Sequence, residues 1–159
     1  MSIFEKYEWQ KNNYIVSTDK EKLDLKAIHN YLTRSSWAKG ISLDIVAESI
    51  KNSLNFGVYH SNSQIGFARL ITDYATFAYL SDVYILEEYH GEGLGRWIME
   101  CIHKHPVFGQ LRRIMLVTTT APWLYEKLGY EPINQKNYTW TIARPDIYNE
   151  GTKTGLPTT

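Results

Sequence analysis

Hydrophobic residues recur at every third or fourth position in two stretches near the start of the chain, a spacing typical of amphipathic helices. Thr18 or Asp19 is suited to cap the first helix, which we expect to run to about Arg34, and Ser42 is suited to cap the second. A loop over residues 35–40 separates the two helices. The apolar stripes are Leu25, Ile28 and Leu32 in the first helix, and Leu43, Val46, Ala47 and Ile50 in the second.

The period of the pattern then changes to two, as expected for β-strands with one buried face. Apolar alternation predicts strands over residues 54–58, 64–72 and 76–86, and the short polar turns between them indicate an antiparallel meander. Tyr14–Ser17 is a further short strand that precedes the first helix, and residues 1–11 are expected to form an irregular lead-in.

A glycine-rich turn follows the last strand of the meander and opens a helix expected over residues 93–104. The sequence of the turn is His90-Gly91-Glu92-Gly93-Leu94-Gly95-Arg96. Backbone that lacks Cβ atoms can approach an anion closely, and the free N–H groups and dipole of a helix N-terminus favour negative charge. The pattern therefore predicts a site for a phosphorylated cofactor.

The last third of the chain adds a strand over residues 112–118, which returns after a helix and should therefore lie parallel to the strand over 76–86. A short helix over 123–128 stops at Gly129, and Tyr138–Ala143 is expected to be the closing strand. This order of elements predicts a mixed sheet with helices packed on it, an α/β (α+β) fold.

Composition limits the class of protein. The 159 residues include 17 Lys+Arg and 17 Asp+Glu, and this balance argues against a general binder of nucleic acids or anionic membranes. No apolar run reaches the roughly 18 residues that span a bilayer. The first residues lack a signal-peptide core and the single cysteine has no intrachain partner, so we expect a cytoplasmic protein. We expect one domain over 1–159, with its core at about 12–143 and a flexible tail over 149–159, and no metal site.

Two motifs resemble those of the GNAT superfamily of N-acetyltransferases. In the acetyl-CoA motif of that family, an Arg or Gln is followed by two residues, Gly, one residue, and Gly or Ala; here His90 takes the first position, with Gly93 and Gly95 in register. The segment 124–130, Leu-Tyr-Glu-Lys-Leu-Gly-Tyr, resembles the second signature. Other glycine-loop sites do not fit, since a P-loop requires Gly-Lys-Ser/Thr and a Rossmann site requires an early βαβ unit.

The resemblance implies a mostly antiparallel sheet of six to seven strands flanked by about four helices, with a V-shaped splay between the fourth and fifth strands. It implies acetyl-CoA as the co-substrate. Backbone amides of the turn would hold its diphosphate, with His90 or Arg96 adding charge, unless His90 is only a solvated turn residue. Backbone groups of the preceding strand would pair with the pantetheine arm, which requires the splay, often helped by a bulge. The implied cofactor-binding residues are Val83, Tyr84, Ile85, His90, Gly91, Glu92, Gly93, Leu94, Gly95 and Arg96.

The resemblance also implies direct acetyl transfer to a primary amine of a small molecule, amino acid or peptide. Asp82 is the candidate base, with Asp73 and Glu87 as weaker alternatives, unless Asp82 only has a structural partner at the strand end. The backbone N–H of Ile85 or Val83 would stabilise the oxyanion.

Tyr125 resembles the general acid of the family, and its alternative role is to fill the core beside Trp123. Cys101 lies on the buried stripe of the motif helix, so a covalent relay through its thiol is not expected. Many family members carry Asn or Asp before the tyrosine helix, whereas here Thr118–Trp123 has neither. A threonine hydroxyl is one substitute, and a late helix start at Pro122 is another explanation.

The loop between the first two helices often covers the acceptor in this family, so Trp37 is a candidate wall of the site or else a core anchor. Asp73, Tyr79 and Tyr84, with Asp82, would add an aromatic and acidic lining suited to a cationic amine. A protein lysine or a polyamine is a further acceptor class. The alternative function is a non-catalytic coenzyme A-binding sensor or partner module, and an RNA-binding domain is remote. Neither nucleic acid nor membrane is expected as a partner, and a homodimer is left open.

Overall fold

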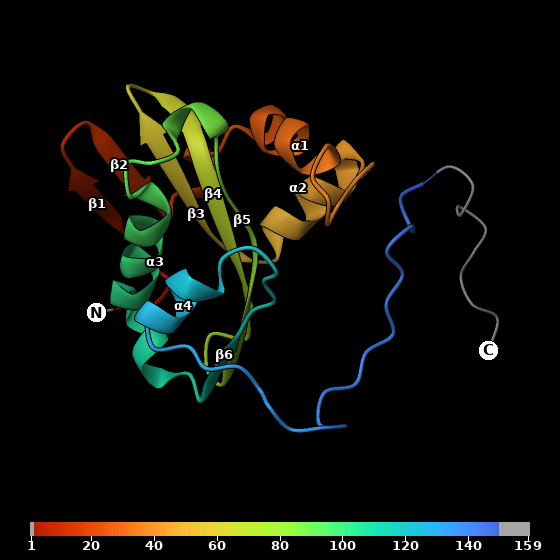
Figure 1. Ribbon diagram of the computed structural model, residues 1–159. Coiled ribbons are helices and arrows are strands. Elements are labelled where there is room, and N and C mark those ends of the chain that lie inside the picture. Colours follow the sequence, from red (N-terminus) through yellow and green to blue (C-terminus); the bar gives the residue numbers. More distant parts are fainter. Residues whose placement is uncertain (1, 150–159) are drawn as a thin grey trace.

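The computed structural model describes residues 2–149 and has a six-stranded sheet at its centre (Figure 1). The strands lie side by side in chain order, and all neighbours are antiparallel except the last two, which are parallel. They are β1 (Glu8–Lys11), β2 (Tyr14–Ser17), β3 (Leu54–His60), β4 (Ser63–Thr72), β5 (Phe77–Ile85) and β6 (Arg113–Met115). The expected mixed, mostly antiparallel sheet is confirmed.

The first strand, β1, corrects the prediction of an irregular lead-in. It pairs with β2 through a tight turn in which Asn12 adopts a φ of 54°, a left-handed conformation that Asn tolerates. At the edge of the sheet only Trp9 turns towards the core, while the other three residues of β1 are exposed. An edge strand of this kind has no alternating apolar pattern by which it could be recognised.

Two helices, α1 (Leu25–Thr33) and α2 (Leu43–Lys51), follow β2. Ser42 caps α2 as expected, with its side chain accepting from the Ile45 N–H at 3.3 Å. The expected cap of the first helix at Thr18 or Asp19 is wrong. Asp19 instead caps a 3₁₀ turn over Lys20–Lys22, and α1 begins only after Asp24, whose carboxylate accepts from the Ala27 N–H at 3.0 Å.

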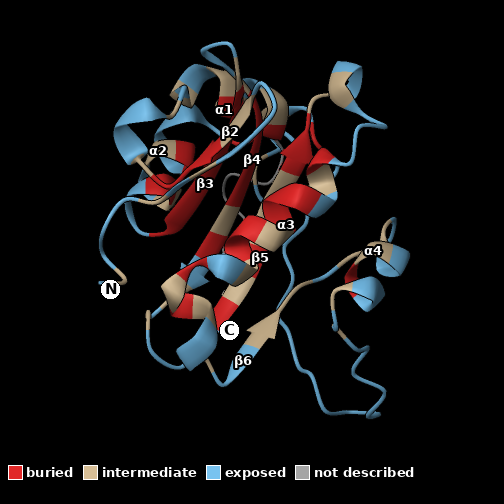
Figure 2. Ribbon diagram, turned by 90° about the vertical axis from the view of Figure 1, so that its left-hand side faces the viewer, coloured by how far each residue is buried: buried red, intermediate tan, exposed pale blue. Residues whose placement is uncertain are grey.

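The helices form a layer on each face of the sheet (Figure 1). α1 and α2 cover one face and bury a cluster that includes Ile28, Val46 and Phe67. The helix α3 (Leu94–Lys104) covers the other face, with Trp97 and Ile98 in a second and larger cluster. Buried residues are therefore concentrated in the strands and in the inner sides of the helices (Figure 2). None of the helices in the described part of the chain is long and apolar enough to cross a bilayer.

The parallel contact between β5 and β6 is short, which confirms the expected splay. Three residue pairs join the strands, from Phe77–Arg113 to Tyr79–Met115. After Met115 the chain leaves β5, so β6 is shorter than the strand expected over 112–118, and within residues 2–149 the edge of β5 beyond Tyr79 has no strand beside it. This opening lies directly before the glycine turn.

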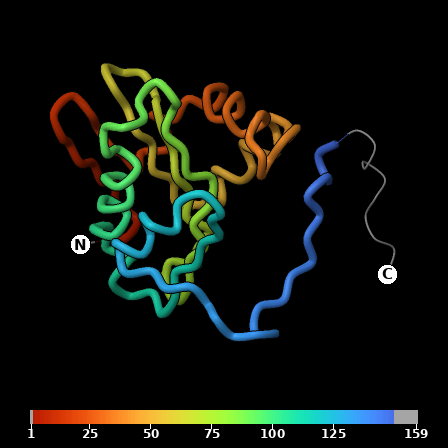
Figure 3. The backbone as a smooth tube through the Cα atoms, in the orientation of Figure 1, coloured from red at the N-terminus to blue at the C-terminus, as the bar shows by residue number. Residues whose placement is uncertain are grey.

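The final segments correct one further expectation. A short helix, α4 (Pro122–Lys127), follows β6, and residues 131–149, which we call the C-terminal arm, then run away from the body of the molecule (Figure 3). The expected closing strand Tyr138–Ala143 lies in this arm and pairs with no strand of the described chain. Of the expected tail over 149–159, all but Asn149 lies outside the described residues.

Candidate active site at the splayed strands

The glycine turn bends sharply before α3. Gly91 and Gly93 have φ values of +85° and +75°, a left-handed conformation that glycine adopts without the penalty that other residues incur. Gly93 is the N-cap of α3, and its carbonyl accepts the first helical hydrogen bond, from the Trp97 N–H at 3.0 Å. No side chain caps this helix. The first N–H groups of α3, at Leu94, Gly95 and Arg96, therefore point outward with the positive end of the helix dipole.

The space in front of the turn is open to a ligand. A Cβ atom built on Gly91, Gly93 or Gly95 would meet no other atom of the described chain within 4 Å. These glycines are therefore not required by close packing within the protein. A bare backbone facing open space beside an uncapped helix N-terminus fits a diphosphate, which needs several N–H donors at short range.

The side chains of the turn mostly hold it in place. His90 Nε2 lies 2.7 Å from the Ile85 carbonyl oxygen and donates to it, so the ring ties the turn back to the end of β5. The Glu92 carboxylate accepts from the Tyr14 hydroxyl at 2.6 Å, which ties the turn to β2. Arg96 is exposed, 3.9 Å from Glu100 on the next helical turn, and it is the cation that can still swing towards an anion at the turn.

A β-bulge shapes the strand that leads to the turn. Phe67 of β4 pairs with Tyr84 and Arg69 pairs with Ser81, so Asp82 and Val83 together lie opposite Ala68. Asp82 has a φ of 57°, uncommon for a residue other than glycine but found for Asp. Such bulges bend a strand and increase its twist, which agrees with the separation of β5 from β6 at this level.

The bulge also decides which backbone groups face the opening. The Leu86 N–H donates to the Ile65 carbonyl on β4 at 2.8 Å. Since backbone groups of a strand alternate between its two neighbours, those of Tyr84 face β4 and those of Val83 and Ile85 face the open side. Of the three residues expected to pair with pantetheine, Val83 and Ile85 are therefore placed for it, although the Ile85 carbonyl is already engaged by His90.

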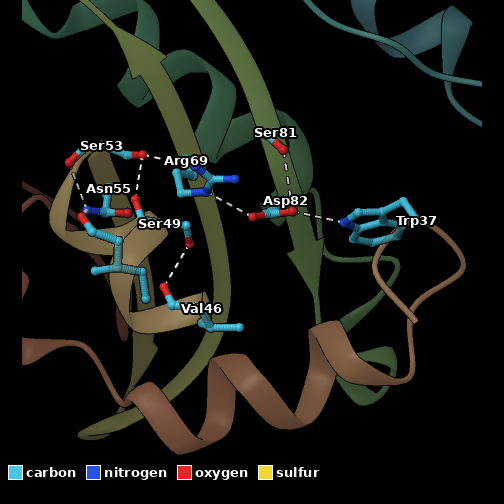
Figure 4. Close-up of polar contacts among 9 residues, drawn as sticks. Trp37, Val46, Ser49, Ser53, Asn55, Arg69, Ser81 and Asp82 are labelled. Carbon is cyan, nitrogen blue, oxygen red and sulfur yellow. Dashed lines mark hydrogen bonds and ion pairs between the residues drawn. The ribbon is translucent and has the colours of Figure 1, made fainter. Parts of the chain in front are cut away.

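Asp82 is the centre of a polar network (Figure 4). Its side chain is 8% exposed, and its Oδ2 forms an ion pair with Arg69 Nε at 2.9 Å. Its Oδ1 accepts from the Trp37 indole N–H at 2.9 Å. Arg69 also donates to the Ser53 hydroxyl at 3.0 Å, which links the network to the end of α2. The Ser81 hydroxyl also donates to Oδ1, at 3.4 Å. The expected structural partner of Asp82 is thus present, and Oδ2 is the carboxylate oxygen that retains a further lone pair.

Trp37 brings the loop between α1 and α2 onto β5. The residue is half-exposed, so it is not the core anchor that was the alternative, and its role as a wall of the acceptor site stays a prediction. Tyr31 lies behind it, with ring centroids 6.3 Å apart, and Tyr31 in turn stacks on Tyr84 at 3.8 Å. Tyr79 lies at the last residue pair between β5 and β6, where the splay begins. The structure thus brings Trp37, Asp82 and Tyr84 together on the α1–α2 side of β5.

Two other carboxylates are used elsewhere. Asp73 lies in the turn between β4 and β5, where it accepts hydrogen bonds from the N–H groups of Ala75, Thr76 and Phe77 and from the Thr76 hydroxyl. These bonds hold the pKa of the Asp73 carboxyl far below its usual range. Glu87 forms an ion pair with Arg34 at 3.2 Å, which lowers its pKa. Neither carboxylate joins the contacts made by Asp82.

Tyr125 lies on α4, buried in the core cluster of α3 with its ring edge-on to Tyr130 at 5.7 Å. The alternative role for Tyr125 was to fill the core beside Trp123, but Trp123 is exposed. Burial raises the pKa of Tyr125, so the phenol is protonated at neutral pH and able to donate. Its hydroxyl makes no hydrogen bond within residues 2–149. Tyr125 also lines a groove of about 720 Å³ that runs along β6 and the first part of the C-terminal arm.

Two further expectations concern the same region. Burial raises the pKa of the Cys101 thiol to about 11, which keeps it protonated and opposes a covalent relay. The helix α4 begins at Pro122, which therefore occupies its first turn as expected, and the Thr118 hydroxyl accepts from the Ala121 N–H at 3.1 Å ahead of it.

Arg69 and the bulge are the parts of the site that the sequence pattern did not predict. A signal for the bulge was present. The apolar positions of β5 change parity, from Ala78 and Leu80 to Val83 and Ile85, and one inserted residue accounts for this change. Arg69 carried no local signal, because its contact with Asp82 depends on how β4 and β5 pair.

Comparisons with known proteins agree with this geometry. A family model described as an acetyltransferase (GNAT) domain matches residues 51–132, which include the bulge, the turn and Tyr125. A protein of the fungus Gibberella zeae, provisionally named an acetyltransferase, is 33% identical over 148 residues that cover 80% of this chain and 84% of the relative.

Solved structures show the same fold. A crystal structure from Xanthomonas campestris pv. campestris, provisionally assigned as a GNAT-family acetyltransferase, is 39% identical with a TM-score of 0.83, covering 86% of this chain and 96% of that one. A GNAT-family acetyltransferase from Elizabethkingia anophelis with acetyl-CoA bound has a TM-score of 0.61 at 13% identity, covering 92% of this chain and 87% of that one. At that identity the likeness concerns the fold alone.

Proposed function

This chain belongs to the GNAT family of acetyltransferases, and from that premise we propose that it transfers an acetyl group from acetyl-CoA directly to a primary amine of a small molecule, amino acid or peptide. The proposal rests on one observation: the open edge of β5, at Val83 and Ile85, leads directly into a glycine turn without side chains and then into a helix without a side-chain cap. An extended arm of amides that ends in a diphosphate fits such a surface along its whole length.

The backbone amides of Gly91 to Arg96 would hold the diphosphate, with Arg96 as the nearby cation. The N–H and carbonyl of Val83 and the N–H of Ile85 would pair with the amides of the pantetheine arm. When bound, acetyl-CoA supplies an activated acetyl group. The Val83 N–H, at the bulge, is then the candidate donor to the acetyl carbonyl oxygen, because the bulge turns it towards the opening between β5 and β6.

We assign the acceptor to the α1–α2 side of β5, between Trp37, Tyr79 and Asp82. An aromatic wall and a carboxylate favour a cationic amine before it reacts. The amine must lose a proton to attack, and Asp82 is the proposed proton acceptor, directly or through water. Its bonds to Arg69 and Trp37 hold the carboxylate in one orientation.

Tyr125 is the proposed proton donor to the departing thiolate. Its protonated phenol and its hydroxyl, which makes no hydrogen bond within the described residues, support this role. Cys101, buried and protonated, takes no part, so attack on the thioester is direct. A single buried thiol also suits a reducing compartment, and we place the protein in the cytoplasm.

The test is a screen of amines for release of free thiol from acetyl-CoA. We expect release with small primary amines or with amino acids or peptides that carry a free amino group, and no release with alcohols of similar shape. Tight binding of coenzyme A without thiol release for any amine would indicate instead the alternative function, a non-catalytic coenzyme A-binding module.

A further inference from the structure

The helices α1 and α2 cover only part of their face of the sheet. Phe67 of β4 and Tyr84 of β5 are the strand residues in the cluster that these helices bury. The end of β5 that lies beside β6 extends past both helices (Figure 1). Apolar side chains at that end are accordingly exposed, Ile71 by 42% and Phe77 by 38%. An apolar surface therefore remains on the same face as the proposed acceptor position.

These side chains belong to a row that crosses three strands. Ile71 on β4 pairs with Tyr79 on β5, and Tyr79 pairs with Met115 on β6. Ala78, next to Tyr79, is buried in the core cluster of α3. Since successive side chains of a strand point to opposite faces, Tyr79 and its paired residues lie on the side of α1 and α2, together with Phe77. We call Ile71, Phe77, Tyr79 and Met115 the apolar strip.

The apolar strip begins next to Asp82. Arg69, the partner of Asp82, pairs with Ser81, and the next pair on the same face is Ile71 with Tyr79. A strand rises about 3.3 Å per residue, so Tyr79 lies about 10 Å along β5 from Asp82. An amine held at the Asp82 carboxylate would therefore place a short alkyl or aromatic tail on the apolar strip.

The apolar strip provides no site for a second positive charge. Asp82 is the only carboxylate in the strands β4, β5 and β6. Asp73, in the turn beyond the strip, is engaged by the N–H groups and the hydroxyl of its own turn. The charged residue at the far end is Arg113, which pairs with Phe77 and would repel an ammonium group. A polyamine on the strip would leave its second ammonium without a counter-ion.

We propose that the acceptor is a primary amine on an apolar tail, alkyl or aromatic, and that Ile71 and Phe77 determine this preference together with Tyr79. The inference rests on the proposed transfer to an amine at Asp82, and it narrows the class of acceptor. The ammonium group faces the carboxylate while the tail lies on the apolar strip, so each end of the acceptor meets a surface of its own chemistry.

The first measurement is of binding and needs no turnover. In conjugates of coenzyme A whose sulfur carries CH₂–CO–NH–R, the group R lies where the acceptor would lie; R is methyl, hexyl or 5-aminopentyl. Full burial of a methylene strengthens binding about fourfold, and we expect about twofold on a face that covers one side of the tail, or roughly 30-fold from methyl to hexyl. The 5-aminopentyl conjugate, equal in length but ending in an ammonium, should bind at least about 10-fold more weakly than the hexyl conjugate. Calorimetric titration gives each Kd.

A variant of the apolar strip and a matched control locate this effect. Ile71→Ser removes one of the three side chains that determine the preference, so the affinity ratio of hexyl to methyl should fall from roughly 30 to about 10. Ile45, on α2, is 45% exposed and lies outside the strip, so Ile45→Ser should keep the wild-type ratio. Both changes are made at exposed positions, and circular dichroism should show an unchanged fold.

The free amines are then compared by thiol release from acetyl-CoA. We expect kcat/KM to be highest for hexylamine and lower for methylamine and 1,5-diaminopentane. No gain in affinity from methyl to hexyl, a 5-aminopentyl conjugate that binds as tightly as hexyl, or a ratio unchanged by Ile71→Ser would each overturn the inference. The expected order of binding without thiol release for any amine would support the apolar strip and refute the proposed transfer, so the two failures are distinguishable.

Discussion

The glycine turn offers the sharpest test of the cofactor site, through the change Gly93→Val. Gly93 has a φ of +75°, and a side chain in the left-handed region costs about 1–2 kcal/mol, with a β-branched residue at the upper end. No protein atom lies within 4 Å of the new Cβ, so no clash is added to this cost. For a chain of this size, 1 kcal/mol lowers Tm by about 2–4 °C, so we expect a loss of about 4–8 °C.

The effect on the ligand should be much larger than the effect on the fold. In wild type, coenzyme A at 100 times its Kd stabilises the folded state by about 2.7 kcal/mol, which raises Tm by about 5–10 °C. In Gly93→Val the branched side chain occupies the space in front of the helix amides. We therefore expect no rise in Tm on adding coenzyme A, measured by differential scanning fluorimetry and checked by calorimetric titration.

Two further variants separate binding from folding. Gly93→Asn adds a side chain at the same place, but Asn accepts the left-handed conformation, so Tm should stay near wild type while the response to coenzyme A is lost. Gly95→Ala adds a Cβ two positions further on, inside α3, where φ is ordinary and the GNAT motif accepts Ala, and it should keep the response. A full rise in Tm with coenzyme A in Gly93→Val would refute the assignment of the diphosphate to this turn.

Three other predictions concern the proposed chemistry and the fold. Tyr125→Phe should lower kcat about 10²-fold at an unchanged Kd for coenzyme A, and a rate within about twofold of wild type would remove the hydroxyl from the mechanism. Asp82→Asn keeps an oxygen for the Trp37 N–H but loses the charge, so kcat should fall at least about 10-fold and should then rise with pH as the acceptor amine deprotonates in solution. Trp37→Phe should mainly raise the KM of the acceptor. If both variants change only this KM, and to the same extent, Asp82 has a positioning role. Burial lowers the pKa of His105 from 6.5 to about 4, so between pH 4 and 6.5 the unfolded chain binds more protons than the folded chain. Urea titrations should therefore show that the free energy of unfolding decreases by up to about 3 kcal/mol as the pH falls from about 6.5 to 4. His105→Asn should lose most of this slope, with a remainder from His103, whose pKa burial also lowers, and an undiminished slope would contradict the assignment.

Local patterns predicted most of the elements. Each of these elements has one buried side, and its apolar residues therefore recur every two to four positions. This spacing predicted the helices α1, α2 and α3 and the strands β3 and β4. The glycine turn was equally visible, since its chemistry needs bare backbone within a few consecutive residues. The two motifs then indicated the family, because they occur in the order of that fold.

The failures have a different origin. The strand β1 is exposed on most of its residues and therefore carries no apolar pattern. The cap of α1 was misplaced because Asp19 and Asp24 are both good caps, and only the 3₁₀ turn between them decides which one begins the helix. The segment Tyr138–Ala143 has the alternating pattern of a strand, yet it pairs with no strand of the described chain, because pairing depends on a neighbouring sheet edge and not on the pattern alone.

The amino-acid sequence by itself determined which faces are buried, where the chain turns and where an anion can approach the backbone, because each of these depends on neighbours along the chain. Only the tertiary structure decided that Asp82 meets Arg69 and Trp37, and that β5 bulges and separates from β6. These contacts join residues far apart in the sequence, and their register is set by the packing of the whole sheet between its two layers of helices.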